Sequence, residues 1–355
     1  MRTYRIDRSY DWNYEHGPIY DGPFPEVPET PTKDFLGIAV KSRIGIAAGL
    51  LLNSRWIDVY SRLGFDLLTY KTVRSRYRKC YQLPNWVYLD PETSLEPSRP
   101  EQQLRARRGR PHDDHTVTSS VSFGMPSKEP EFWMADVARA RGHLRPGQAL
   151  IVSVVASPEA GSGVGAMISE FSSLAAMARE AGAQVVEANL SCPNVTTPEA
   201  EIYQDPELSR QIAKAMREAV GDTPIALKAG YFQGKEPLVG FLRAIDGLAD
   251  AAVLVNGFSR RVVDSRDKPV FGSGREASGI LGRGIHEPCV DLVRRAITTI
   301  RDDKLGLRVI AVGGVYAQEH AENYFDVGAD AVIMGSAPMF EPTIAISFKQ
   351  AHPEW

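Results

Sequence analysis

Four side chains that can do chemistry stand together in the segment Asn189-Leu-Ser-Cys-Pro-Asn194. The apolar and β-branched run at 184–187, which follows Gly182, predicts a strand that ends where these polar residues begin. Two carboxamides and the hydroxyl of Ser191 offer donors and acceptors to a planar polar ligand, and the thiol of Cys192 can take a proton. A free cysteine buried in a polar turn is the alternative, but each polar neighbour would then need its own partner.

This segment resembles that of the dihydroorotate dehydrogenases, flavin enzymes that oxidise dihydroorotate to orotate on an FMN-bearing barrel. The resemblance implies that Asn189 and Asn194 contact the pyrimidine and that Cys192 is the catalytic base. With a cysteine at this position the segment resembles that of the class 1 enzymes, whereas the membrane-associated class 2 enzymes have a serine there.

Composition limits the fold and the kind of ligand. With 355 residues, 43% of them hydrophobic and 24% charged, the chain can form one large α/β barrel or two ordinary domains. The 41 basic and 44 acidic residues nearly cancel, so we expect a small-molecule ligand and neither nucleic acid nor a membrane surface. Three distant cysteines predict no disulfide framework and no metal site, and a reducing cytoplasm fits them. No stretch of about 18 apolar residues occurs.

Short apolar runs alternate with helical patterns from residue 43 onward, which is typical of βαβ units around a parallel sheet. We therefore predict a (β/α)₈ TIM barrel. A doubly wound sheet is the alternative, but no Gly-x-Gly-x-x-Gly turn follows the first strand. The predicted strands are residues 44–47, 67–71, 150–155, 185–189, 225–228, 252–256, 309–312 and 331–334. The predicted helices are residues 54–63, 132–141, 164–181, 206–220, 237–248, 287–301 and 317–327, with a last one after residue 342.

Segments outside this alternation are expected to be irregular. Residues 1–40, rich in Tyr, Trp and Pro, predict an N-terminal arm on the surface of a barrel domain at 41–355. The arm lacks an amphipathic helix pattern, which disfavours quinone as electron acceptor. Long loops at 84–131 and 259–287 follow strand ends and are expected to be lids or binding loops on the catalytic face. His112 and His115 in the first loop are interpreted as exposed polar residues rather than metal ligands.

Small residues at the last two predicted strand ends indicate a phosphate site. Without a Cβ, the backbone N–H groups of Gly313, Gly314 and Gly335, with that of Ser336, can approach a phosphate. The glycines could instead make tight turns, and the pattern does not separate FMN from a sugar phosphate.

The flavin assignment depends on the resemblance. It implies that Lys228 faces the N1/C2 side of FMN and that Lys71, a further catalytic residue, stands between flavin and substrate carboxylate. A core salt bridge with a carboxylate such as Glu187 is the alternative for the two lysines. The FMN contacts implied are Ala47, Ala48, Gly49, Lys71, Thr72, Asn189, Lys228, Gly282, Gly313, Gly314, Gly335 and Ser336.

One departure from the family pattern concerns the substrate. The resemblance adds Asn256, Ser122 and Gly124 to the substrate contacts, but a family asparagine aligns with Val121. A pocket that lacks one carboxamide can select another molecule, unless Arg74, Ser120 or Ser122 replaces it.

We therefore expect an FMN-dependent, homodimeric dihydroorotate-oxidising enzyme. The alternatives are the same machinery acting on another cyclic amide or unsaturated carbonyl compound, and a phosphate-binding isomerase or lyase without flavin.

Overall fold

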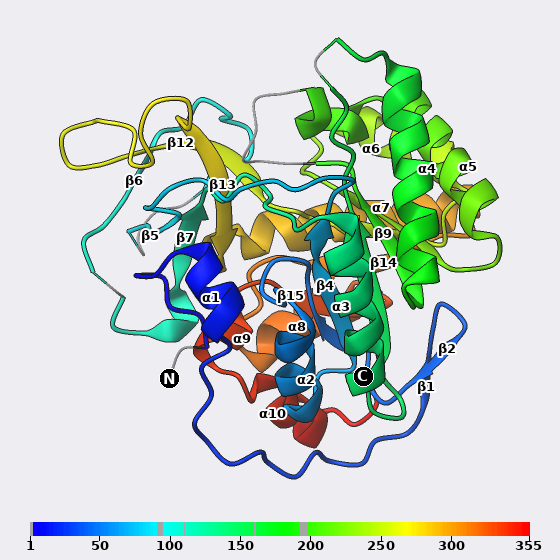
Figure 1. Ribbon diagram of the computed structural model, residues 1–355, viewed down its shortest axis with the longest axis horizontal. Coiled ribbons are helices and arrows are strands. Elements are labelled where there is room, and N and C mark those ends of the chain that lie inside the picture. The colour runs from blue at the N-terminus through cyan, green and yellow to red at the C-terminus, as the bar shows by residue number, and fades with distance from the viewer. Residues whose placement is uncertain (1–2, 91–94, 110, 160, 192–197) are drawn as a thin grey trace.

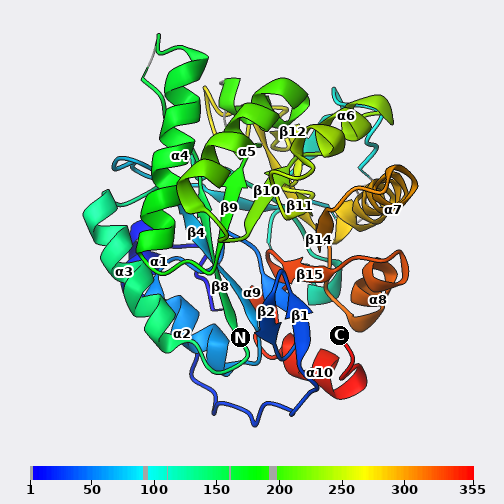
Figure 2. The ribbon, with the colours of Figure 1, turned by 90° about the vertical axis from the view of Figure 1, so that its right-hand side faces the viewer.

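The computed structural model describes residues 3–90, 95–109, 111–159, 161–191 and 198–355. Eight parallel strands of this part of the chain close into a barrel, in the order β3, β4, β8, β9, β10, β11, β14, β15 (Figure 2). The prediction of a (β/α)₈ barrel is confirmed. The barrel strands are β3 (Ile44–Ile46), β4 (Leu67–Val73), β8 (Ala149–Val154), β9 (Val185–Asn189), β10 (Ile225–Ala229), β11 (Ala251–Leu254), β14 (Arg308–Val312) and β15 (Ala331–Met334).

Helices surround the barrel, as Figure 2 shows. Their ends carry recognisable signals: Asp205 accepts a hydrogen bond from the N–H of Leu208 and Pro206 begins α5, whereas Lys304 in the left-handed region ends α7. The surrounding helices are α2 (Ser54–Arg62), α3 (Pro130–His143), α4 (Val164–Glu180), α5 (Pro206–Val220), α6 (Glu236–Ile245), α7 (His286–Asp303), α8 (Gln318–Asp326), α9 (Ala337–Phe340) and α10 (Ile344–Ala351).

The barrel interior changes character along its length. Apolar side chains such as Val185, Ala226 and Ile310 belong to one buried cluster inside the strands. Because alternate residues of a strand point the same way, the residues that continue these rows toward the carboxyl ends include Asn189 and Lys228, which are register partners on β9 and β10. The interior is thus apolar at one end and polar at the end where barrel enzymes carry their sites.

The two long connections are not without secondary structure, contrary to the sequence-based expectation. Together they form a five-stranded sheet beyond the barrel, in the order β5, β7, β13, β12, β6 (Figure 1). The segment 279–282, expected to be a loop, is the end of strand β13, and Val121 ends strand β7. The strands are β5 (Trp86–Tyr88), β6 (Leu104–Arg105), β7 (Thr118–Val121), β12 (Phe258–Val263) and β13 (Ala277–Gly282).

The N-terminal arm is also more regular than predicted. It contains helix α1 (Tyr10–His16), whose first turn is capped by the hydroxyl of Ser9, and a hairpin of β1 (Lys33–Phe35) and β2 (Ile38–Val40). Figure 1 shows the arm, in blue, running along the molecule from α1 to this hairpin. The hydroxyls of Thr3 and Tyr60 are 2.6 Å apart, and the N–H of Thr3 donates to the carbonyl of Met339 at 3.1 Å. These bonds fix the start of the arm against α2 and α9.

Candidate active site

A cavity of about 1250 Å³, including the part open to solvent, lies between the carboxyl ends of the barrel strands and the added sheet. It brings together thirteen of the residues predicted to form the site, from seven barrel strand ends and β13. They are Ala47, Ala48, Gly49, Lys71, Thr72, Asn189, Lys228, Asn256, Gly282, Gly313, Gly314, Gly335 and Ser336.

Two carboxamides on the barrel rim hold one another in place. The Nδ2 of Asn256 donates to the Oδ1 of Asn189 at 3.2 Å, to the carbonyl of Ser191 at 2.6 Å and to its hydroxyl at 3.0 Å. The Oδ1 of Asn189 also accepts from the N–H of Ser191, while its Nδ2 meets the Met125 sulfur, a weak acceptor, at 3.6 Å. Asn189 can therefore donate, and Asn256 accept, at adjacent points of the cavity. This pair complements the N–H and C=O of a cyclic amide.

Lys228 is a buried cation that faces the cavity. It is 2% exposed, lines the cavity, and forms no ion pair within the described ranges. Glu187 is equally buried, but its Oε1 has no hydrogen-bond partner there, so the alternative of a core salt bridge between these two residues is not observed. An unpaired buried charge is costly, and an anionic ligand group at this end of the cavity would compensate it. Lys71, half-buried on β4, lines the same cavity.

The glycines at the last two strand ends form a cradle. Gly314 has a φ of 67°, and a Cβ there would lie 2.7 Å from the Cβ of His286, so a side chain is excluded by α7. At Gly335, a Cβ would meet no protein atom within 4 Å, and because the residue lines the cavity, the open space there is ligand space. The backbone around these glycines thus fits a phosphate group.

Three aromatic groups of the site escaped the sequence analysis. Tyr4 and Tyr10 of the N-terminal arm and Trp86 of β5 line the cavity, so the arm belongs to its wall. The rings of Tyr4 and Trp86 both lie near that of Phe123, at 6.2 and 6.5 Å between centroids. Burial raises the pKa values of both tyrosines, which keeps the phenols neutral. The clustering of the two tyrosines with other aromatic residues in the arm was visible, but nothing local pointed them at a site formed by Ala47 and later residues.

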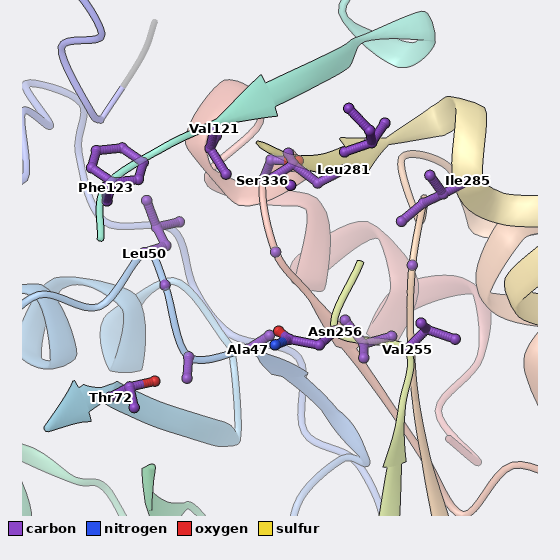
Figure 3. Close-up of a pocket in the computed structure, with 18 of the residues that line it drawn as sticks. Ala47, Leu50, Thr72, Val121, Phe123, Val255, Asn256, Leu281, Ile285 and Ser336 are labelled. Atoms are coloured by element: carbon purple, nitrogen blue, oxygen red, sulfur yellow. The ribbon is translucent and has the colours of Figure 1, made fainter. Parts of the chain in front are cut away.

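The wall opposite the carboxamides is apolar. Figure 3 shows Val121 and Phe123 at the end of β7, across the cavity from Asn256 and Thr72. Met125 continues this row, whereas the predicted contacts Ser122 and Gly124 alternate with it and are not among the cavity-lining residues.

None of the three polar residues suggested as a replacement for the missing carboxamide lines the cavity. Arg74 donates to the carbonyl of Met125, and the hydroxyl of Ser120 lies 2.7 Å from that of Ser278. The hydroxyl of Ser122 is buried without a partner among the described residues. The three candidate replacements for the missing carboxamide therefore face away from the cavity.

Two predicted site residues, Cys192 and Asn194, lie outside the described residues. In the part of the chain that is described, no group of three His, Cys, Asp or Glu side chains could hold a metal ion. His115, from the first long connection, donates through Nδ1 to the carbonyl of Tyr316 at 2.7 Å.

The fold and the cavity define a class: a (β/α)₈ barrel protein with a glycine cradle at its last two strands and a rim that carries two carboxamides and a buried lysine. Within that class, the family model for dihydroorotate dehydrogenase matches residues 124–350. A dihydroorotate dehydrogenase from Dictyostelium discoideum is 32% identical over 97% of this chain and 96% of the relative. The chain belongs to the dihydroorotate dehydrogenase family.

More distant relatives match a shorter region. The catalytic subunit of dihydroorotate dehydrogenase B (NAD(+)) from Solidesulfovibrio magneticus is 29% identical over 52% of this chain and 58% of the relative. The corresponding subunit from Carboxydothermus hydrogenoformans is 28% identical over 45% of this chain and 49% of the relative. The chain thus spans about half the length of these two proteins and nearly all of the Dictyostelium protein.

Proposed function

We propose that this protein binds FMN and oxidises dihydroorotate to orotate. The observation that carries the proposal is the meeting, in one cavity, of the buried cation of Lys228, the glycine cradle and the carboxamide pair of Asn189 and Asn256. Membership of the family supports it. A phosphate-binding barrel without flavin would explain the cradle, but it would give no reason for an uncompensated lysine at the rim.

The residues of the chain fit FMN in separate parts. Backbone N–H groups at Gly314, Gly335 and Ser336 would hold the phosphate, and Ala47, Ala48 and Gly49 would lie against the ring. A Cβ at Gly49 would meet no protein atom within 4 Å, so this surface is open to a flat group. When bound, FMN supplies the atom that accepts a hydride. Lys228 would place positive charge where the reduced flavin gains negative charge.

The protein side chains provide binding and proton removal. Asn189 and Asn256 would orient the substrate through its amide edge, with Asn194 as a third carboxamide, and Lys71 would face the substrate carboxylate. The thiolate of Cys192 takes a proton from the substrate CH₂ group as the adjacent CH loses its hydride. One C=C bond forms and the two electrons leave with the hydride. The roles of Cys192 and Asn194 come from the family resemblance.

A second candidate substrate is another cyclic amide or unsaturated carbonyl compound. The apolar wall of Val121, Phe123 and Met125 favours it, because dihydroorotate would leave part of its polar edge facing that wall. An unpaired polar group of this kind costs about 1–3 kcal/mol.

Anaerobic flavin reduction tests the proposal. The purified protein should be yellow, and dihydroorotate should bleach its flavin absorbance while orotate perturbs the spectrum. A colourless protein that gains no absorbance when FMN is added would overturn the flavin assignment. If dithionite reduces the flavin but dihydroorotate does not, the second candidate substrate would be favoured over dihydroorotate.

The assembly and location of the protein are further proposals. We infer a homodimer in the cytoplasm, which light scattering on the purified protein and fractionation of cells would test. Among the described residues, no helix combines the length and the apolar character needed to cross a membrane.

A further inference from the structure

We infer that His320 is a positioning residue of the FMN site, which holds the phosphate-binding loop in shape through an acceptor nitrogen. The loop is residues 313–317, between β14 and α8. Its residues Gly313, Gly314 and Tyr316 line the cavity. The inference rests on the proposed function, because it concerns the part of the cavity assigned to the FMN phosphate.

The hydrogen bonds fix the role of the imidazole. The Nδ1 of His320 accepts from the backbone N–H of Tyr316 at 3.2 Å and from that of Ala317 at 3.1 Å. Both donors are backbone amides, so this nitrogen must carry its lone pair and the ring must be neutral. The cap residue of α8 is Ala317, which has no side-chain acceptor. His320, the third residue of α8, instead does what the Glu or Gln of a capping box does, because its side chain reaches back to the backbone N–H of the cap residue.

Tyr316, whose N–H is held in this way, makes two more hydrogen bonds, one of them to the cradle. The hydroxyl of Tyr316 lies 2.6 Å from the hydroxyl of Ser336, which is on the other side of the cradle. The carbonyl of Tyr316 accepts from His115. Tyr316 is thus fixed at its N–H, its carbonyl and its phenol, and its backbone position sets the distance between the two glycine segments.

Three histidines surround the loop, but they do not respond alike to protonation. His115 and His286 donate through Nδ1 to the carbonyls of Tyr316 and Gly313, and a protonated ring keeps that donor. At His320 the same nitrogen is an acceptor, and a proton on it removes both hydrogen bonds to the loop. Acid therefore acts on the loop through His320.

The surroundings of His320 favour its neutral form. Burial, together with the nearby His286, Arg283 and His115, lowers the pKa of His320 from 6.5 to about 4, and Glu287 acts in the opposite direction. The carboxylate of Glu319 lies 3.5 Å from Nε2 but is exposed to solvent. A histidine with a pKa lower in the folded than in the unfolded chain contributes its full stabilisation above about pH 6.5. This contribution falls as the pH drops toward 4.

The test measures FMN release from the holoenzyme of three variants. His320→Asn keeps an acceptor on the same side-chain atom position but does not titrate, and His320→Leu removes the acceptor. His143→Asn, on α3 and exposed, is the control for a histidine substitution. Released FMN is followed by its fluorescence after dilution at pH 7 and at pH 4.5, and the bound phosphate by its ³¹P resonance.

At pH 7, His320→Leu should weaken FMN retention by about 10-fold or more, as expected from the loss of two hydrogen bonds, and shift the ³¹P resonance. FMN retention by His320→Asn should stay within about threefold of that of the parent, because the change is no larger than the loss of one ordinary hydrogen bond. Between pH 6.5 and 4.5, retention should fall more steeply in the parent and in His143→Asn than in His320→Asn. The phosphate of FMN titrates in the same range, but equally in all proteins.

Identical pH profiles for the parent and His320→Asn, or unchanged retention in a folded His320→Leu protein, would overturn the inference. Neither result would touch the proposed function, which fails if no variant and no parent binds FMN. Melting curves of each holoenzyme separate loss of the loop from loss of the fold.

Discussion

Replacing Lys228 with methionine tests the electrostatic design of the site. Methionine keeps the unbranched apolar stem and removes the charge, so the packing inside the barrel changes little. In the parent, the ammonium group faces the cavity without an ion-pair partner among the described residues. Its field therefore acts on whatever anion the cavity receives, and reduction of a bound flavin creates such an anion.

The size of the effect follows from Coulomb's law. Two unit charges about 4 Å apart interact by about 4 kcal/mol at an effective dielectric constant of about 20. For a two-electron couple, about 1.4 kcal/mol corresponds to about 30 mV. Lys228→Met should therefore lower the flavin midpoint potential by up to about 90 mV, because the reduced state loses its counter-charge. Flavin reduction by dihydroorotate should slow in the same variant.

Dye-coupled anaerobic titration of the bound flavin measures the potential. Lys214→Met, an exposed residue of α5 that forms an ion pair with Glu218, is the matched control and should leave the potential unchanged. A midpoint potential of Lys228→Met equal to that of the parent, or above it, would refute the placement of this charge beside the flavin. A variant that melts earlier and holds no flavin would be replaced by Lys228→Gln.

Four further substitutions probe the remaining parts of the site. Gly335→Val should abolish FMN retention but change the melting temperature of the apoprotein little, because a Cβ at this position meets no protein atom within 4 Å. Gly314→Val should lower the melting temperature of the apoprotein, because its Cβ would meet His286. Calorimetry of the apoprotein, combined with flavin absorbance, distinguishes the two effects. Cys192→Ala should slow flavin reduction by roughly 10²–10⁴-fold, the range for a positioned base, and equal stopped-flow rates in variant and parent would exclude that role. Val121→Asn should strengthen orotate binding by about 1–3 kcal/mol, because the polar edge of orotate would recover a hydrogen bond. Weaker orotate binding by the variant than by the parent, measured by titration of the flavin spectrum, would show that the apolar wall does not face the pyrimidine.

The barrel and its strand-end residues could be predicted because their signals are local. Strands β9 and β15 were predicted with the bounds that the structure has, since each is a short apolar run with a turn signal after it. Their meeting in one cavity could also be predicted, because the carboxyl ends of barrel strands lie on one face. The individual roles given to these residues depend on the family resemblance instead.

The added sheet could not be predicted because its strands depend on distant partners. The segment Thr118–Val121 reads as polar, and it becomes a strand by pairing with Ala277–Gly282 about 160 residues later. For the same reason, the sequence analysis did not identify which alternate side chains of the segment after Val121 face the cavity. A shift by one residue exchanges Ser122 and Gly124 for Phe123 and Met125 as the side chains that face the cavity.

The position of the arm has a consequence for how the protein is made. The N–H of Thr3 donates to the carbonyl of Met339, so the arm finds its partner in a helix that is synthesised much later than the arm itself. At about 5–20 residues per second, synthesis of the intervening chain takes tens of seconds. Tyr4 and Tyr10 cannot complete the cavity wall before then. We therefore expect nascent chains that lack α9 to expose the aromatic residues of the arm and to retain no cofactor, so that FMN is loaded only after α9 has been synthesised.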